Sequence, residues 1–271
     1  MLKGSHIMAV DSQLIRLMKD RTYNPWDRSG RTGNGHRTFL PLPDPNIPDL
    51  GSVEVWSEGV WIGIDCGFSP DPTAIVIVKH MSIHSHYNAR LESGREYTKS
   101  KTTSLYRVVK AEELTGVTYP DQRDHVQRII DNERLYDNRE VSIVLDATGV
   151  GVAVSQDWRN GLENYDNFIP VTITSGQPRK LRNKSVSDLL LGTMRVFEEG
   201  RCSIPKSQDF AIRKLQLQLI NRGVETDIRG RLKAIDERSS SMSHFDLSIA
   251  LSLVVGHLEA EDAKFVPMML A

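Results

Sequence analysis

The 271-residue sequence has little of three features that define large classes of protein. Its two cysteines, Cys66 and Cys202, cannot build a zinc knuckle, and their spacing indicates no disulfide framework, so a reducing cytoplasm fits. No run of about 18 apolar residues occurs, which excludes a membrane-spanning helix. The formal net charge is −1, so no global field marks a polyanionic partner, and basic patches must be judged one by one.

The sequence also lacks a phosphate-binding loop. The pattern Gly-x-x-x-x-Gly-Lys-Ser/Thr does not occur, and residues 30–35 (Gly-Arg-Thr-Gly-Asn-Gly) contain no lysine. Gly149 and Gly151 follow a predicted strand, but Val154 leaves the dinucleotide fingerprint incomplete, so these glycines favour a tight turn instead. The chain by itself is therefore predicted not to be an ATP-driven motor.

Composition and proline content predict the domain organisation. Hydrophobic residues make up 39% of the chain and charged residues 25%, which is typical of a soluble globular core. Residues 1–55 are predicted to hold a tag remnant at 4–8, a short helix at 10–19 and a proline-rich flexible linker. Residues 56–260 are predicted to form the folded domain, and residues 261–271 a C-terminal tail.

Hydrophobic periodicity predicts a mixed α/β fold. Runs of β-branched and apolar residues predict strands at 60–64, 74–78, 105–111, 141–145 and 168–173, the first three as an antiparallel meander. Three- and four-residue spacing predicts helices at 120–135, 149–158, 185–199, 210–220 and 244–258. Two short strands are expected at 224–228 and 232–235, and the polar stretch 80–103 is expected to be an exposed loop or hairpin tip.

Three acids stand at the edges of apolar elements. Asp65 and Asp146 each end a predicted strand, and Asp246 lies in the first turn of the last predicted helix. Taken singly, each has an ordinary structural explanation as a turn residue, a helix cap or a complement to the helix dipole. Strand ends that point the same way deliver their side chains to one crevice, where grouped carboxylates repel each other and a hard divalent cation removes that penalty.

Three segments carry a resemblance to a known family. They are residues 63–67 and 71–74 (Gly-Ile-Asp-Cys-Gly and Asp-Pro-Thr-Ala), 145–151 (Leu-Asp-Ala-Thr-Gly-Val-Gly) and 244–251 (His-Phe-Asp-Leu-Ser-Ile-Ala-Leu). They resemble the acidic motifs of the nuclease domain of phage terminase large subunits, and the resemblance extends over residues 60–258. It implies a ribonuclease H-like fold, a mixed sheet flanked by helices.

The resemblance also implies a function and a set of metal ligands. The expected activity is that of a metal-dependent endonuclease, a phosphodiester hydrolase that uses two Mg²⁺ or Mn²⁺ ions to cut concatemeric viral DNA during genome packaging, with low sequence specificity. The implied ligands are Asp65, Asp146 and Asp246, and Asp71 matches a further acid of some members. The implied partners are double-stranded DNA, a packaging ATPase domain, a small terminase subunit and the portal, in the host-cell cytoplasm.

Two departures from the family pattern bear on these expectations. The last motif often reads His-Asp-Asp in relatives, whereas here it is His244, Phe245 and Asp246, so one acid carries that end. The packaging ATPase of a full large subunit has no counterpart here. The chain is thus expected to be either an excised nuclease domain or a separate nuclease-like product.

Basic clusters and two auxiliary side chains complete the candidate site. Thr148 is expected to bond Asp146 or substrate, or to serve only the turn, and His244 to orient a water, contact phosphate or cap its helix. The basic residues either contact DNA phosphates or are solvated surface charge; they are Arg179, Lys180, Arg182 and Lys184 in one cluster and Arg229, Arg231 and Lys233 in the other.

Two other functions remain open on the sequence alone. A Holliday-junction resolvase uses the same arrangement of acids on branched DNA. A non-catalytic module that docks DNA or a portal would share the fold without the chemistry.

Overall fold

The computed structural model of the chain describes thirteen stretches of the sequence. They are residues 37–40, 50–67, 71–90, 96–132, 140–148, 151–163, 165, 167–174, 183–205, 207–221, 224–226, 232–234 and 245–262. The chain divides into two compact units, of which the first contains Met1–Glu58, His80–Leu105 and Glu199–Arg201. The second contains Gly59–Lys79, Tyr106–Glu198 and Cys202–Ala271, and it holds all three predicted acids.

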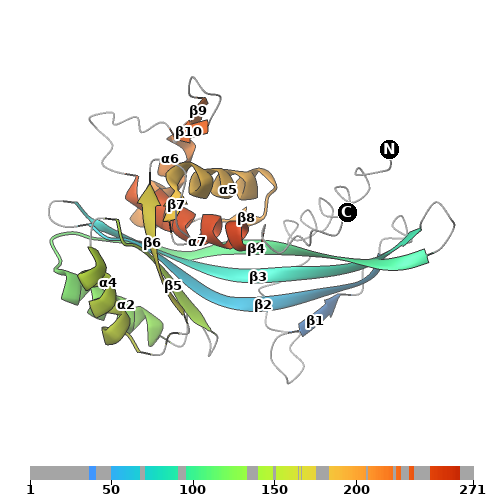
Figure 1. Cartoon of the computed structure of the whole chain (residues 1–271), viewed down its shortest axis with the longest axis horizontal. Coiled ribbons are helices and arrows are strands. Elements are labelled where there is room, and N and C mark those ends of the chain that lie inside the picture. Colours follow the sequence, from blue (N-terminus) through green and yellow to red (C-terminus); the bar gives the residue numbers. More distant parts are fainter. Residues whose placement is uncertain are drawn as a thin grey trace. The chain divides into compact units, whose positions relative to one another are not determined.

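Most of the strands belong to one sheet (Figure 1). Its order is β7-β6-β5-β2-β3-β4-β8, with β1 paired to β2, while β9 and β10 pair separately. The strands are β1 (Arg37–Leu40), β2 (Leu50–Asp65), β3 (Thr73–Arg90), β4 (Glu96–Leu114), β5 (Val141–Asp146), β6 (Asn167–Thr174), β7 (Asn183–Ser185), β8 (Cys202–Ser203), β9 (Val224–Thr226) and β10 (Leu232–Ala234).

The sheet is mixed, as the sequence predicts. Short connections join β2 to β3 and β3 to β4, and adjacent strands joined in this way run antiparallel, because a parallel pair needs a long crossover. β5 pairs with β2, β6 with β5 and β7 with β6, all in parallel. β2 and β5 therefore end at the same edge of the sheet.

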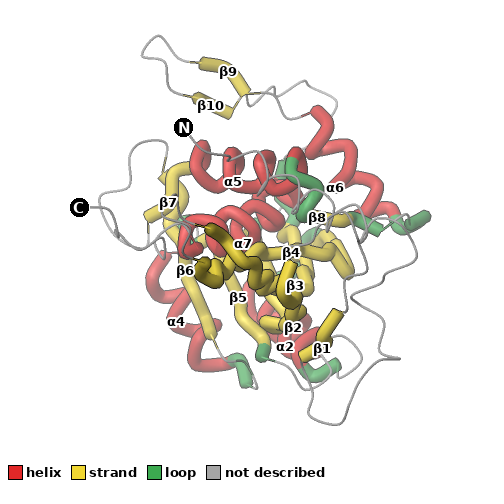
Figure 2. Tube along the Cα trace, turned by 90° about the vertical axis from the view of Figure 1, so that its right-hand side faces the viewer, coloured by secondary structure: helices red, strands yellow, loops and turns green. Residues whose placement is uncertain are grey.

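Helices of the second unit cover both faces of this sheet (Figures 1 and 2). The helices α5 (Val186–Glu198), α6 (Phe210–Asn221) and α7 (Asp246–Asp262) lie on one face, and α2 (Tyr119–Ile130) and α4 (Gly151–Gly161) lie on the other. We call these the α7 face and the α2 face. The predicted α/β class is confirmed, and each of these five helices was expected from the sequence within a few residues.

Strand alternation divides the side chains of β2 and β5 between the two faces. Ile62 and Ile64 of β2 belong to the hydrophobic cluster on the α2 face, whereas Trp61 packs against the cluster on the α7 face. In β5, Leu145 lies on the α2 face and Val144 on the α7 face. Because successive side chains point to opposite faces, residues two positions apart share a face.

Helix α7 lies directly against β2 at Gly63. A Cβ atom at residue 63 would stand 2.0 Å from the carbonyl oxygen of Ala250, so only glycine permits this approach. Further along the helix, the ring centroid of His257 lies 6.1 Å from that of Trp61. Moving back along the strand corresponds to moving forward along the helix, so α7 runs antiparallel to β2 and its first turn lies toward the end of the strand.

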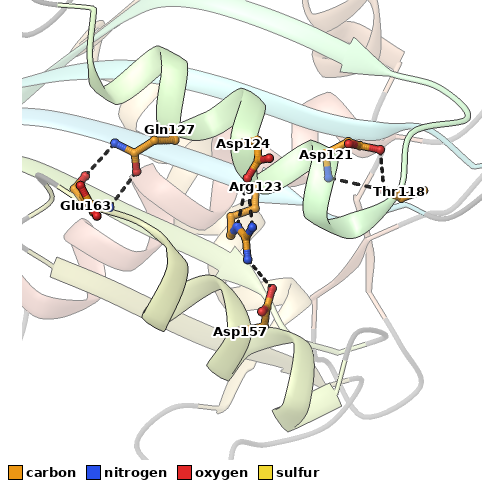
Figure 3. Close-up of polar contacts among 7 residues, drawn as sticks. All are labelled: Thr118, Asp121, Arg123, Asp124, Gln127, Asp157 and Glu163. Carbon is orange, nitrogen blue, oxygen red and sulfur yellow. Dashed lines mark hydrogen bonds and ion pairs between the residues drawn. The ribbon is translucent and has the colours of Figure 1, made fainter.

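Polar contacts attach α2 to α4 (Figure 3). Arg123 Nη1 donates to Asp157 Oδ2 over 3.0 Å. The Gln127 amide pairs with the main chain of Glu163, donating to its carbonyl oxygen over 3.1 Å and accepting from its N–H over 2.7 Å. Thr118 caps α2 by accepting from the N–H of Asp121. Arg123 and Gln127 therefore hold the middle and the C-terminal part of α2, and Thr118 caps its first turn.

Three parts of the chain differ from the sequence-based expectation. The stretch 80–103, predicted as an exposed loop or hairpin tip, lies largely in β3 and β4. Its polar residues are accommodated by pairing: Ser82 is buried, donates to Glu58 and bonds His84. Strand β1 and the start of β2 fall in the predicted linker, and the short strands β7 and β8 were not expected.

The predicted domain boundaries themselves remain predictions. Among the described helices, none is long and apolar enough to cross a membrane.

Candidate active site

Two of the predicted acids end neighbouring strands. The parallel register pairs Gly63 with Val144 and Ile64 with Leu145. The next residue on each strand is an aspartate, Asp65 on β2 and Asp146 on β5. The pairing of these strands therefore places two carboxylates side by side at one edge of the sheet.

Both carboxylates point to the α7 face. Asp65 follows Trp61 and Gly63 at steps of two, and both of those residues contact α7. Asp146 follows Val144, which belongs to the cluster that includes α7 residues. The two acids thus share a face as well as an edge.

The third acid begins the helix on that same face. Asp246 lies four residues before Ala250, or about 6 Å back along the helix axis. Asp65 lies two residues beyond Gly63, or about 7 Å on along the strand. Because Ala250 stands over Gly63 and the helix runs antiparallel to the strand, Asp246 and Asp65 lie toward the same end of β2.

The three acids do not form a closed cluster. Within the described part of the chain, no group of three or more His, Cys, Asp and Glu side chains is placed to hold a metal ion. Asp71, the fourth predicted acid, is exposed in the turn between β2 and β3, and its main-chain oxygen packs closely against Gly67. The structure therefore places Asp65 and Asp146 on adjacent strand ends, Asp246 in the helical turn toward the same end of β2, and Asp71 on the solvent side of the turn.

The surroundings of the pair disfavour negative charge. Burial raises the pKa of the Asp146 carboxyl above its ordinary value, and hydrogen bonds from Thr148 act in the opposite direction. Burial also raises the pKa of the Cys66 thiol, and the nearby charges of Asp65 and Asp146 raise it further. The thiol therefore stays protonated at neutral pH and is no nucleophile here.

Thr148 fixes the orientation of Asp146. Its main-chain N–H donates to Asp146 Oδ1 over 2.8 Å. Its hydroxyl oxygen accepts from the N–H of Ile173 on β6 over 2.7 Å. The turn after β5 is thus tied both to the carboxylate and to the next strand, which leaves Asp146 Oδ2 outside this hydrogen bond.

The remaining predicted contacts lie outside the part of the chain whose side chains are described. His244 and the basic residues Arg179, Lys180, Arg182, Arg229 and Arg231 fall outside the described residues. Lys184 lies in β7 and Lys233 in β10, but only their main chain is described. Their contacts with DNA stay predictions.

Neither a protein-family model nor a curated protein sequence matches the chain. The chain is similar in structure to nuclease domains of the large terminase subunit gp2 of bacterial virus Sf6. A mutant domain with calcium has 12% sequence identity and a TM-score of 0.48. A mutant domain with manganese and beta-thujaplicinol has 10% identity and a TM-score of 0.46, and the nuclease domain itself has 11% and 0.45. Each similarity covers 73% of this chain and 88% of the other.

These domains belong to the family that the sequence motifs resemble. The strand directions and the helices on both faces confirm the predicted α/β class, a mixed sheet flanked by helices, and the ribonuclease H-like assignment stays what the motifs imply. At identities of 10–12% and TM-scores of 0.45–0.48, the similarity assigns no residue a role. The function must therefore be argued from the side chains of this chain.

The donor atoms at this edge of the sheet suit a hard divalent cation. Asp65, Asp146 and Asp246 supply carboxylate oxygens, which Mg²⁺ and Mn²⁺ prefer. Burial raises the pKa of the Asp146 carboxyl, and a cation bound beside it would favour the charged form. That these three side chains bind a metal together remains a prediction.

Proposed function

We propose that this chain is a divalent-metal-dependent DNA endonuclease that cuts concatemeric viral DNA during genome packaging. One observation carries the proposal: two aspartates end adjacent parallel strands on the face where the helix bearing a third aspartate begins. A lone acid at a strand end is common, but three acids that lie toward one end of the same strand, on separate elements, favour a functional site.

The three acids would hold two Mg²⁺ or Mn²⁺ ions, with Asp71 as an outer candidate. Such ions, when bound, activate water and neutralise charge on a phosphodiester. Asp65 and Asp146 supply oxygens from the rigid edge of the sheet, and Asp246 supplies them from the first turn of α7. Thr148 keeps Oδ1 of Asp146 engaged, which restricts the orientation of the carboxylate.

The substrate would be held by its backbone. The basic residues 179–184 and 229–233 would contact phosphates, which gives affinity without sequence preference. The packaging ATPase, the small terminase subunit and the portal are the partners that this role requires, in the cytoplasm of the infected host.

Plasmid nicking with Mn²⁺ tests the proposal. Asp65→Asn, Asp146→Asn and Asp246→Asn should each lower the nicking rate by at least about 100-fold. Each substitution keeps the shape of the side chain and removes the negative charge that binds the metal. Asp188→Asn is the matched control, since Asp188 is exposed in the first turn of α5. Wild-type rates in all three variants would overturn the metal site.

The same preparation separates the two alternatives. Faster cleavage of four-way junctions than of linear duplex by the wild-type protein would favour a resolvase. Duplex binding with no cleavage in Mg²⁺ or Mn²⁺ would favour a docking module.

A further inference from the structure

The main chain two residues beyond Asp65 is held by side chains from two other places in the fold. Thr73, buried on β3, accepts from the N–H of Gly67 over 3.0 Å and donates to its carbonyl oxygen over 3.1 Å. Gln122 of α2 donates from Nε2 to the same oxygen over 3.2 Å. The carbonyl oxygen of Gly67 therefore accepts two hydrogen bonds, which fixes the turn that follows Asp65.

Gln122 is built into this position. Its side chain is 1% exposed, and Nε2 also donates to the carbonyl oxygen of Val117 over 2.8 Å. Two carbonyl neighbours identify this atom as the amide nitrogen, since an amide oxygen there would face two acceptors. Helix α2 is in turn held to α4 by Arg123 and Gln127 (Figure 3), so Gln122 reaches the turn from a fixed base.

A second buried glutamine plays the matching part beside Asp246. The first N–H groups of a helix have no partner within it, and a polar N-cap side chain usually accepts from one of them. The residue before α7 is Phe245, whose side chain cannot accept a hydrogen bond. Instead, Gln218 of α6 accepts from the N–H of Ser248 over 2.9 Å, and both residues are buried.

We infer that Gln122 and Gln218 are positioning residues, which hold the main chain beyond Asp65 and Asp246 so that these carboxylates are in place before a metal binds. The inference rests on the proposed function for its purpose. Thr148 does the same for Asp146 from within its own turn. Each acid is thus followed, two residues on, by a residue that a hydrogen bond ties to another element.

Matched glutamine variants test this. Gln122→Met and Gln218→Met keep the length of the side chain and remove its hydrogen bonds. Gln127→Met is the control, because Gln127 lies on the same helix as Gln122 and also bonds main chain, but at Glu163 rather than at an acid. Two measurements are made on the full chain: amide hydrogen exchange without metal, and Mn²⁺ binding by calorimetry.

Gln122→Met should speed exchange at residues 65–67, and Gln218→Met at residues 246–248, each by at least about tenfold over the control. Both variants should raise the Kd for Mn²⁺ by about 10-fold, the lower end of the effect of outer-shell partners of metal ligands. Gln127→Met should leave that Kd within about twofold while lowering the thermal midpoint. Gln122→Glu should act like Gln122→Met, because it puts an acceptor opposite two carbonyl oxygens.

Two further outcomes separate failure of the inference from failure of the proposed function. Exchange at the acid-bearing segments that rises no more in the two variants than in Gln127→Met overturns the positioning role. If exchange rises as expected but the wild-type protein binds no Mn²⁺, the positioning role of Gln122 and Gln218 is supported and the metal-dependent function is overturned.

Discussion

The two faces of the sheet hold their helices by different means. On the α7 face, main chains approach closely in addition to the packing of side chains: Gly63 admits Ala250 of α7, and Gly256 of α7 in turn admits the main chain of Leu189 on α5. Helix α7 is buried on nearly all sides over its first three turns, including Ser248 and Ser252. On the α2 face, helix α2 buries one side and is tied by polar groups along its exposed side.

This difference indicates how each face controls the candidate site. The position of Asp246 depends on the hydrogen bond to Gln218 and, above all, on volume, because α7 fits only where glycines leave space. The position of Asp65 depends also on direction, because Gln122 of α2 holds the following turn by a hydrogen bond. Substitutions on the two faces should therefore differ in how much they change stability and in the reason for the change.

The largest expected effect is that of Gly63→Ala on the α7 face. The added Cβ would meet the main chain of Ala250 at 2.0 Å, and a main chain inside a helix cannot move aside cheaply. We expect a loss in free energy of unfolding on the order of 3 kcal/mol, at the upper end of overpacking effects, measured by urea denaturation. A loss below about 0.5 kcal/mol would contradict the close approach of α7 to β2.

Asp146→Asn should have an intermediate and opposite effect on stability. Burial raises the folded-state pKa of Asp146 above its unfolded value, so the folded protein loses stability as pH rises through that pKa. The asparagine removes this loss and keeps the acceptor for Thr148. Without metal, the variant should therefore be more stable than wild type at pH 7, and the difference should shrink as pH falls.

Thermal unfolding with chelator, followed from pH 7 to pH 4.5, checks that prediction. Asp188→Asn is again the control, and it should show no such pH-dependent gain. A gain that is the same at every pH would show that packing, and not charge, is the cause.

The smallest effect is expected for Asp157→Asn on the α2 face. Asp157 pairs with Arg123 over 3.0 Å, but its side chain is 54% exposed, so solvent screens the pair. We expect a loss of a few tenths of a kcal/mol in urea denaturation and no change in nicking. A loss as large as that of Gly63→Ala would mean that the two faces are not held differently.

Local pattern predicted much of the fold and of the candidate site. Strands such as β5 and helices such as α5 follow from apolar spacing. An acid at the end of a buried strand indicates a functional site, because burying a carboxylate costs free energy. Pattern failed at residues 80–103, because His80 and Ser82 are buried in β3, where cross-strand partners such as Glu58 accommodate the serine. It also gave no signal for Gln122 and Gln218, whose partners are 55 and 30 residues away.

The register of β2 on β5 has a consequence for how this site tolerates change. Along each strand the face is decided by odd or even position, so Asp65 and Asp146 reach the α7 face only because they stand an even number of residues from Trp61 and Val144. One residue inserted or deleted within either strand would point its acid into the apolar layer beneath α2 and α4. The two strands can therefore accept substitutions at this edge, but a single-residue insertion or deletion would remove an acid from the site.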